Sequence, residues 1–163
     1  MANTQAMCTS FMQQLMVGEH QLGTATLVSR TSLTAPTTDT LKAALYLTTA
    51  TVNAATTAYS ASNEVSGNNY VAGGVTVTNA TAPNSTNTTA TAGVAFFTPS
   101  ASITYTTVTL STAFDAVLIY NSTQSNKAIS VHTFGSQTVT AGTFTLTMPS
   151  NTTTTALIRL ATT

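Results

Sequence analysis

Few side chains in this sequence could do acid–base or nucleophilic chemistry. The 163 residues contain four acidic residues, four basic residues and two histidines, so that charged residues make up 5% of the chain, against roughly 25% in an average soluble protein. No acidic residue lies within a short sequence window of another; the four are Glu19, Asp39, Glu64 and Asp115. Because catalytic sites are built from ionisable groups with perturbed pKa values, this scarcity argues against an enzyme. We predict no catalytic residue.

The two histidines and the single cysteine show no spacing typical of a metal site or a nucleophile. His20 and His132 lie far apart in the sequence, and Cys8 has no His or Asp partner near it. We therefore predict no metal site, no cofactor, and a free, partly buried thiol without a disulfide partner. His132 follows Val131, which favours a hydrogen-bonded residue in a strand. A Ser-His-Asp triad stays open because triads form only in three dimensions, but no Gly-x-Ser-x-Gly, Walker or dinucleotide-binding pattern occurs.

Composition also limits the class of partner. The net charge is zero, and the basic residues do not cluster; they are Arg30, Lys42, Lys127 and Arg159. Binding to nucleic acid needs clustered cations to neutralise phosphates, so we expect no nucleic-acid partner. No apolar run is long enough to cross a membrane as a helix, and residues 11–17 are too short, and lack the basic lead-in, for a signal peptide. We expect no membrane partner and no small-molecule substrate, whereas a neutral surface can pack against identical neighbours at low desolvation cost.

The elements that carry these residues are predicted to be strands. Threonine supplies about a quarter of the chain, and β-branched residues favour strands. Alternating or continuous apolar runs predict strands at residues 41–47, 71–78, 103–110, 116–120, 128–134, 139–148 and 157–160. A phase slip at Thr106 and Thr107 predicts a bulge, residues 116–120 predict a fully covered central strand, and residues 79–92 predict a long loop. The pattern predicts an all-β fold, as a single-domain β-sandwich or a jelly-roll-like barrel.

The first twenty residues differ from the rest of the chain. Met7, Phe11, Leu15 and Met16 recur at helical spacing and predict a short amphipathic helix that ends near Gly18. We therefore divide the chain into an N-terminal helical arm at residues 1–20 and a β-sandwich domain at residues 21–163. The arm could cover one end of its own sheet or dock on a neighbouring subunit, and the sequence does not choose between them.

The most specific segment is residues 57–74, which read T-A-Y-S-A-S-N-E-V-S-G-N-N-Y-V-A-G-G. This segment resembles a family of small virion proteins of tailed bacteriophages that carry an Asn/Gly-Glu-Val-Ser-Gly-x-x-Tyr-x-Ala-Gly-Gly segment. The matching positions are Tyr59, Asn63, Glu64, Val65, Ser66, Gly67, Tyr70, Gly73 and Gly74. The likeness continues in order through residues 38–46, 114–121, 127–129 and 138–146, and so covers most of the chain beyond residue 38. The Thr- and Asn-rich residues after 79 depart from the family pattern, and they could form a surface knob or a lattice contact.

The resemblance implies a structural role in a virion. Such proteins look like head decoration or cement proteins, which clamp neighbouring capsid subunits from outside. The implied partners are the major capsid protein and copies of the chain itself, with a homotrimer as the analogy-based expectation. The implied location is the outer surface of the capsid, after assembly in the host cytoplasm. Some relatives are tail or fibre components, so a tail component in assembly or host attachment is the alternative.

The residues of the segment also support local predictions. Gly67, Gly73 and Gly74 provide backbone freedom for tight turns or positive φ. Tyr59 and Tyr70 are expected to cover the edge of the core while their hydroxyls stay in water. Glu64 could cap backbone amides in the turn or meet a basic residue of a partner. A glycine-rich crossover loop and a contact site are therefore both open interpretations of the segment.

Overall fold

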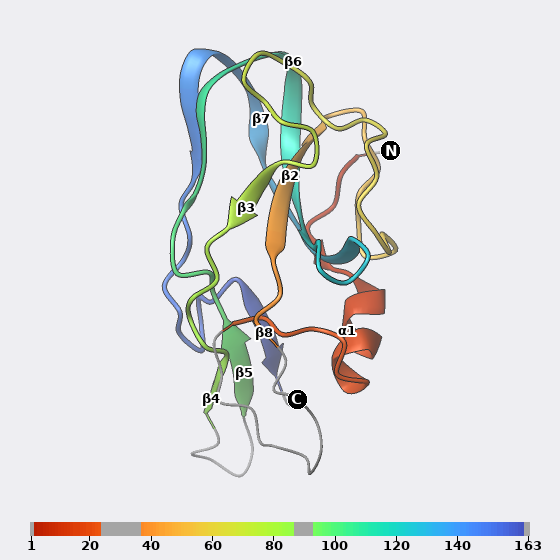
Figure 1. The fold of residues 1–163 in the computed structure, drawn as a ribbon, viewed down its shortest axis with the longest axis vertical. Coiled ribbons are helices and arrows are strands. Elements are labelled where there is room, and N and C mark those ends of the chain that lie inside the picture. Colours follow the sequence, from red (N-terminus) through yellow and green to blue (C-terminus); the bar gives the residue numbers. More distant parts are fainter. Residues whose placement is uncertain (1, 24–36, 87–92, 162–163) are drawn as a thin grey trace.

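The computed structural model describes residues 2–23, 37–86 and 93–161 and shows an all-β fold with one short helix (Figure 1). The larger sheet has the strand order β1-β7-β6-β2-β3; its strands are β1 (Ala6–Met7), β2 (Leu41–Leu47), β3 (Val75–Val77), β6 (Ile103–Asn121) and β7 (Lys127–Leu146). The smaller sheet has the order β4-β5-β8; its strands are β4 (Asn84–Thr86), β5 (Val94–Phe97) and β8 (Ile158–Ala161). All neighbouring strands are antiparallel, and neither sheet closes into a barrel within the described residues. The predicted all-β fold with a short N-terminal helix is confirmed.

The long β6–β7 hairpin folds back over itself and supplies two layers. In Figure 1 the hairpin reaches the top of the molecule and turns down again. The side chains agree: Tyr105 Oη donates a 2.8 Å hydrogen bond to the carbonyl of Ala43 in β2. The ring of Phe144 meets the rings of Phe114 and Phe134, with centroid distances of 5.0 and 5.3 Å. Residues 103–110 and 139–146 therefore form an outer layer, which packs on an inner layer of β2 and residues 114–121 and 127–134.

The core lies between these layers. Residues 116–120 are buried at every position, as predicted for a covered central strand. In the outer layer, buried and exposed positions alternate through Ile103, Thr104 and Tyr105. The predicted slip is present as a register shift between Tyr105 and Val108, and Thr107 has φ 54°.

The helix α1 (Thr9–Met16) packs on its own chain. Phe11 is fully buried in the same hydrophobic cluster as β2, β6 and β7. The helix ends at Met16, close to the predicted end, and Gly18 follows the C-cap residue Val17 with φ 76°, the left-handed conformation common just after a helix C-terminus. The predicted apolar stripe is wrong at two positions. Met7 belongs to β1 and pairs with Ser130 in β7. Met16 is 87% exposed, because five residues carry it about 140° around the helix from Phe11.

Several predicted strand and loop boundaries need correction. The predicted strand at residues 71–78 is restricted to β3, because Gly73 and Gly74 have positive φ and Val71 is 70% exposed. The strands predicted at residues 103–110 and 116–120 are one strand, β6, and those at 128–134 and 139–148 are mostly one strand, β7. The loop predicted at residues 79–92 contains β4, and its residues 87–92 lie outside the described residues. The sequence analysis also missed β1 and β5.

Candidate functional site

The motif found in the sequence joins the two layers at one side of the molecule. We call residues 63–74 the interlayer segment. At its start, the Val65 amide donates to the Leu45 carbonyl in β2, at 3.0 Å, and the Asn63 carbonyl accepts from the Leu47 amide. Further on, Asn68 and Thr109 exchange two backbone hydrogen bonds of 3.1 and 3.0 Å, which attaches the segment to the outer layer. The segment then leads into β3. It therefore runs beside the part of β2 with which β3 does not pair.

Glu64 is the centre of the interlayer segment. Its carboxylate accepts hydrogen bonds from Tyr59 Oη at 2.6 Å, Tyr70 Oη at 2.7 Å and the Gly73 amide at 2.8 Å. The residue is only 9% exposed, and no cation among the described residues forms an ion pair with it. Three donors thus satisfy the hydrogen-bonding capacity of one buried carboxylate. The predicted capping of a backbone amide is confirmed at Gly73.

All five tyrosines of the chain surround this carboxylate. Tyr59 stacks on Tyr120 with a centroid distance of 4.8 Å, and Tyr70 stacks on Tyr105 at 5.9 Å. Tyr120 Oη donates to the Gly73 carbonyl at 2.7 Å, and Tyr46 Oη donates to the Ser60 carbonyl at 2.5 Å. The hydroxyls of Tyr59 and Tyr70 therefore both donate to Glu64, a partner that the sequence analysis did not predict for them.

Burial and the nearby carboxylate hold these phenols neutral. Burial first, and proximity to Glu64 second, raise the pKa values of four phenols; they are Tyr59, Tyr70, Tyr105 and Tyr120. Burial also raises the pKa of Tyr46 to about 12. A protonated phenol can donate to Glu64 or to a carbonyl, so the neutral forms are the ones that the hydrogen bonds require.

The glycines of the segment are needed for two different reasons. Gly74 has φ 70°, and a Cβ there would lie 1.7 Å from the Ala43 carbonyl oxygen. Gly73 has φ 87°, so the prediction of positive φ is confirmed at both positions. Gly67 does not have positive φ, but a Cβ there would lie 2.0 Å from the Thr109 carbonyl oxygen. The role of Gly67 is therefore close approach to the outer layer.

The remaining motif positions have simpler environments. Asn63 adopts a left-handed conformation with φ 59°, which Asn tolerates better than most residues. Val65 is buried and Ser66 is exposed. The structure thus brings Tyr59, Tyr70 and Gly73 together on Glu64, whereas Gly67 and Gly74 lie against Thr109 and Ala43.

The residues considered for catalysis do not assemble into a triad. Ser130 Oγ lies 2.9 Å from His132 Nε2, as expected for a hydrogen-bonded strand histidine. Among the described residues, no carboxylate forms a hydrogen bond with His132; Asp115 instead accepts one from Asn3. Burial lowers the pKa of His132 to about 4, which makes it a poor base near neutral pH.

The environment of Cys8 is unfavourable for a nucleophile. Cys8 is free and fully buried, and burial raises the pKa of its thiol to about 11. Thiolate chemistry is therefore disfavoured.

Within the described ranges, no three His, Cys, Asp or Glu side chains group in a way that could hold a metal ion. None of the described helices is long and apolar enough to span a membrane.

A second polar cluster, which the sequence analysis missed, lies where α1 meets the β6–β7 turn. We call it the His20 junction; its residues are Gln14, His20, Asp39, Asn121 and Gln124. Asp39 is 4% exposed and Asn121 is fully buried. These residues are far apart in the sequence and have no shared motif, so only the fold reveals the cluster.

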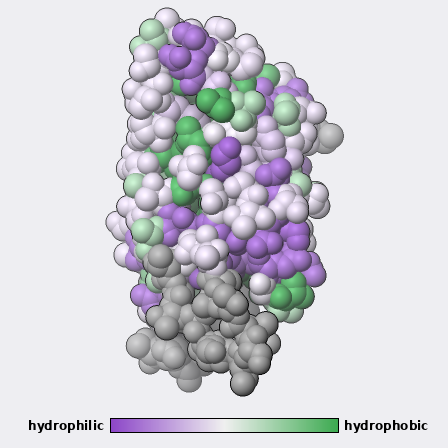
Figure 2. Space-filling model, viewed as in Figure 1, coloured by the Kyte–Doolittle hydropathy of each residue, from purple (hydrophilic) through white to green (hydrophobic). Residues whose placement is uncertain are grey.

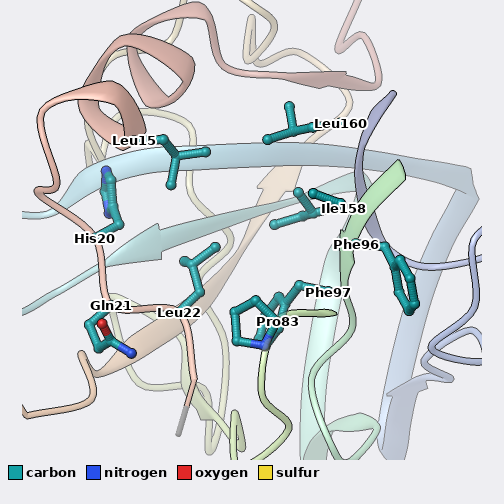
Figure 3. A pocket seen from close by; sticks show the side chains of 10 residues that line it. Leu15, His20, Gln21, Leu22, Pro83, Phe96, Phe97, Ile158 and Leu160 are labelled. Atoms are coloured by element: carbon teal, nitrogen blue, oxygen red, sulfur yellow. The ribbon is translucent and has the colours of Figure 1, made fainter. Parts of the chain in front are cut away.

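An apolar groove of about 260 Å³ adjoins the His20 junction (Figure 3). Leu15, His20 and Leu22 line it from the N-terminal segment, and Phe97 and Ile158 line it from the smaller sheet. Elsewhere, the face in Figure 2 is mostly near neutral in hydropathy, with small scattered polar and apolar areas.

Comparison of the chain with protein-family models, curated proteins and solved structures gives no match.

Proposed function

We propose that this chain is a structural virion protein of a tailed bacteriophage, and specifically a decoration or cement protein on the outer surface of the head. The observation that carries the proposal is the resemblance of residues 57–74 to the motif of that family. The geometry supports the proposal because motif residues have specific structural roles. Glu64, Gly67 and Gly74 each meet a structural demand that other residue types would not meet at the same spacing.

The surface chemistry is compatible with a clamp between neighbouring subunits. Charged residues make up 5% of the chain and the net charge is zero, so identical copies repel one another little. Exposed threonines can form many weak polar contacts, and repetition over a shell multiplies their effect. The proposed partners are the major capsid protein and copies of the chain, as a homotrimer. We propose no enzymatic activity for it.

The proposal is tested by the copy number of the chain in purified virions. Quantitative mass spectrometry would compare the chain with the major capsid protein and with a tail protein in the same particles. A decoration protein is expected in hundreds of copies per particle, in a fixed ratio to the capsid protein. A few copies, in a fixed ratio to the tail protein, would instead support the tail alternative. Absence from purified particles would overturn both virion roles.

A further inference from the structure

The buried amide of Asn121 has a fixed orientation in the His20 junction. Its Oδ1 accepts hydrogen bonds from the backbone amides of Thr123 and Gln124, at 3.0 and 3.1 Å. Its Nδ2 therefore faces Asp39 Oδ2, at 2.6 Å, and His20 Nδ1, at 2.9 Å. Reversing the amide would place its NH₂ group against two backbone N–H donors and its oxygen against the Asp39 carboxylate, so these three contacts determine the orientation.

This orientation determines the protonation state of His20. The NH₂ group of Asn121 can only donate, so His20 Nδ1 must accept with its lone pair. The proton of the neutral ring is then on Nε2, which donates to Gln14 Oε1 at 2.8 Å. Gln14 is 7% exposed and belongs to α1. The neutral ring of His20 thus connects the helix to the β6–β7 turn, and it also packs edge-on against Phe11, with a centroid distance of 5.0 Å.

Protonation would destroy this connection. A proton on Nδ1 would face the NH₂ of Asn121, which is a contact between two donors. The other acceptor that the Asn121 NH₂ contacts, Asp39 Oδ2, already accepts from Asn121 at 2.6 Å and from the Gln21 amide at 2.8 Å. The imidazolium can reach Asp39 only if Asn121 or the segment around His20 moves.

We propose that the His20 junction is an acid-sensitive connection, and that protonation of His20 detaches α1 and residues 17–22 from the β6–β7 turn. The charged groups that face the ring are Asp39 before β2, Glu19 after α1 and Lys127 at the start of β7. Burial lowers the pKa of His20 below its ordinary value of 6.5, with Lys127 in the same direction and with Asp39 and Glu19 opposed. A lowered folded-state pKa means that the stabilisation is present above 6.5 and is lost as the pH falls through the folded-state value.

Detachment would also change the apolar groove. His20, Leu15 and Leu22 form one wall of the groove in Figure 3, and all three belong to the segment that moves. The opposite wall, with Phe97 and Ile158, belongs to the smaller sheet. Acid is therefore expected to widen the groove and expose apolar side chains.

Amide hydrogen exchange tests the proposal directly. Protection factors, which correct for the intrinsic pH dependence of exchange, would be compared at about pH 7.5 and about pH 5. In the unmodified chain, protection at residues 11–22 is expected to fall at least roughly tenfold at the lower pH, with little change in β2 and residues 116–120 of β6. His20→Gln is expected to remove this pH dependence. His132→Gln is the matched control, since it removes the only other histidine, and it should retain the response.

Two results would overturn the proposal. One is unchanged protection at residues 11–22 in the unmodified chain, and the other is an equal pH response in folded His20→Gln. If His20→Gln does not fold, NMR titration of the unmodified chain decides the matter. The His20 ring should then titrate below its ordinary pKa of 6.5, and protection at residues 11–22 should decline between pH 6.5 and the pKa of the folded ring. Constant protection over that interval would contradict the coupling.

Discussion

Glu64 carries much of the interlayer segment's stability because one carboxylate receives three donors in a buried position. Tyr59 and Tyr70 approach from outside the strands, and Gly73 provides its backbone amide. Hydrogen bonds to a charged group are worth more than neutral ones, and a donor left without an acceptor in a buried site adds a desolvation cost. The residue that the sequence singles out as a motif glutamate is thus an internal structural group.

Replacement of this carboxylate should destabilise the fold. Glu64→Gln keeps the shape but leaves one acceptor oxygen for three donors, so the free energy of unfolding is expected to fall by about 3 kcal/mol. Denaturant unfolding measures the change. The matched control is Glu19→Gln, whose carboxylate forms a surface ion pair with Lys127 and whose loss should cost at most about 1 kcal/mol. Equal effects of the two variants would contradict the role of Glu64.

The tyrosines should resist alkaline titration. The pKa of Tyr46 is raised from 10.0 to about 12, and the other four are also raised. Since the unfolded chain loses its phenolic protons first, stability is complete below pH 10 and declines as the pH rises from there. Tyrosinate absorbance, recorded together with circular dichroism, should rise only when the protein unfolds. Titration of two or more tyrosines near pH 10 in the folded protein would refute this description of the cluster.

At the scale of elements, the central feature is the hairpin that folds over itself. Local pattern predicted several of its parts correctly: the covered residues 116–120, the alternation from Ile103 and the bulge at Thr107. The pattern could not show that the predicted strands are parts of two long, bent, paired strands. Alternation with a period of two residues indicates which face of a strand is buried, but it does not show whether the strand continues after an irregular stretch. The short strands β1, β4 and β5 contain too few residues to give a period.

The candidate site was predicted only in part. The motif drew attention to Glu64 and its glycines, and the capping of an amide followed from the residue types. The hydrogen bonds of Tyr59 and Tyr70 to Glu64 could not follow from residue types alone. The stack of Tyr59 on Tyr120 could not follow either, since it joins residues that are far apart in the sequence. The His20 junction escaped prediction for the same reason: Asp39 and Asn121 meet only after β2 pairs with β6.

The glycine requirement in the turn before β3 gives a test of the element-scale account. Gly74→Ala forces a Cβ toward the Ala43 backbone at positive φ, and we expect it to cost more than about 2 kcal/mol or to prevent folding. Gly135→Ala is the control, because a Cβ there meets nothing within 4 Å, and its effect should stay within about 1 kcal/mol. Thermal unfolding of both variants provides the comparison. A Gly74→Ala protein as stable as Gly135→Ala would show that the segment can move away from β2.

At the scale of the whole molecule, the chain combines an internally braced β fold with a surface of few charges. Glu64, the one charge of the interlayer segment, is turned inward, and the face in Figure 2 is dominated by near-neutral residues. Such a surface offers hydroxyls and amides for repeated contacts and has little charge to direct it to nucleic acid. These properties suit a protein whose role is to form structural contacts within an assembly.

The most direct test of the proposed virion role is the position of the chain in a particle reconstruction. We expect density with the shape of this two-layered β fold on the outer surface of the head, repeated with the symmetry of the shell and in contact with the major capsid protein. Particles from a phage that lacks the gene for the chain, reconstructed in the same way, should lose that density and no other. Density confined to the tail, or a head surface that is identical with and without the chain, would contradict the assignment as a decoration protein.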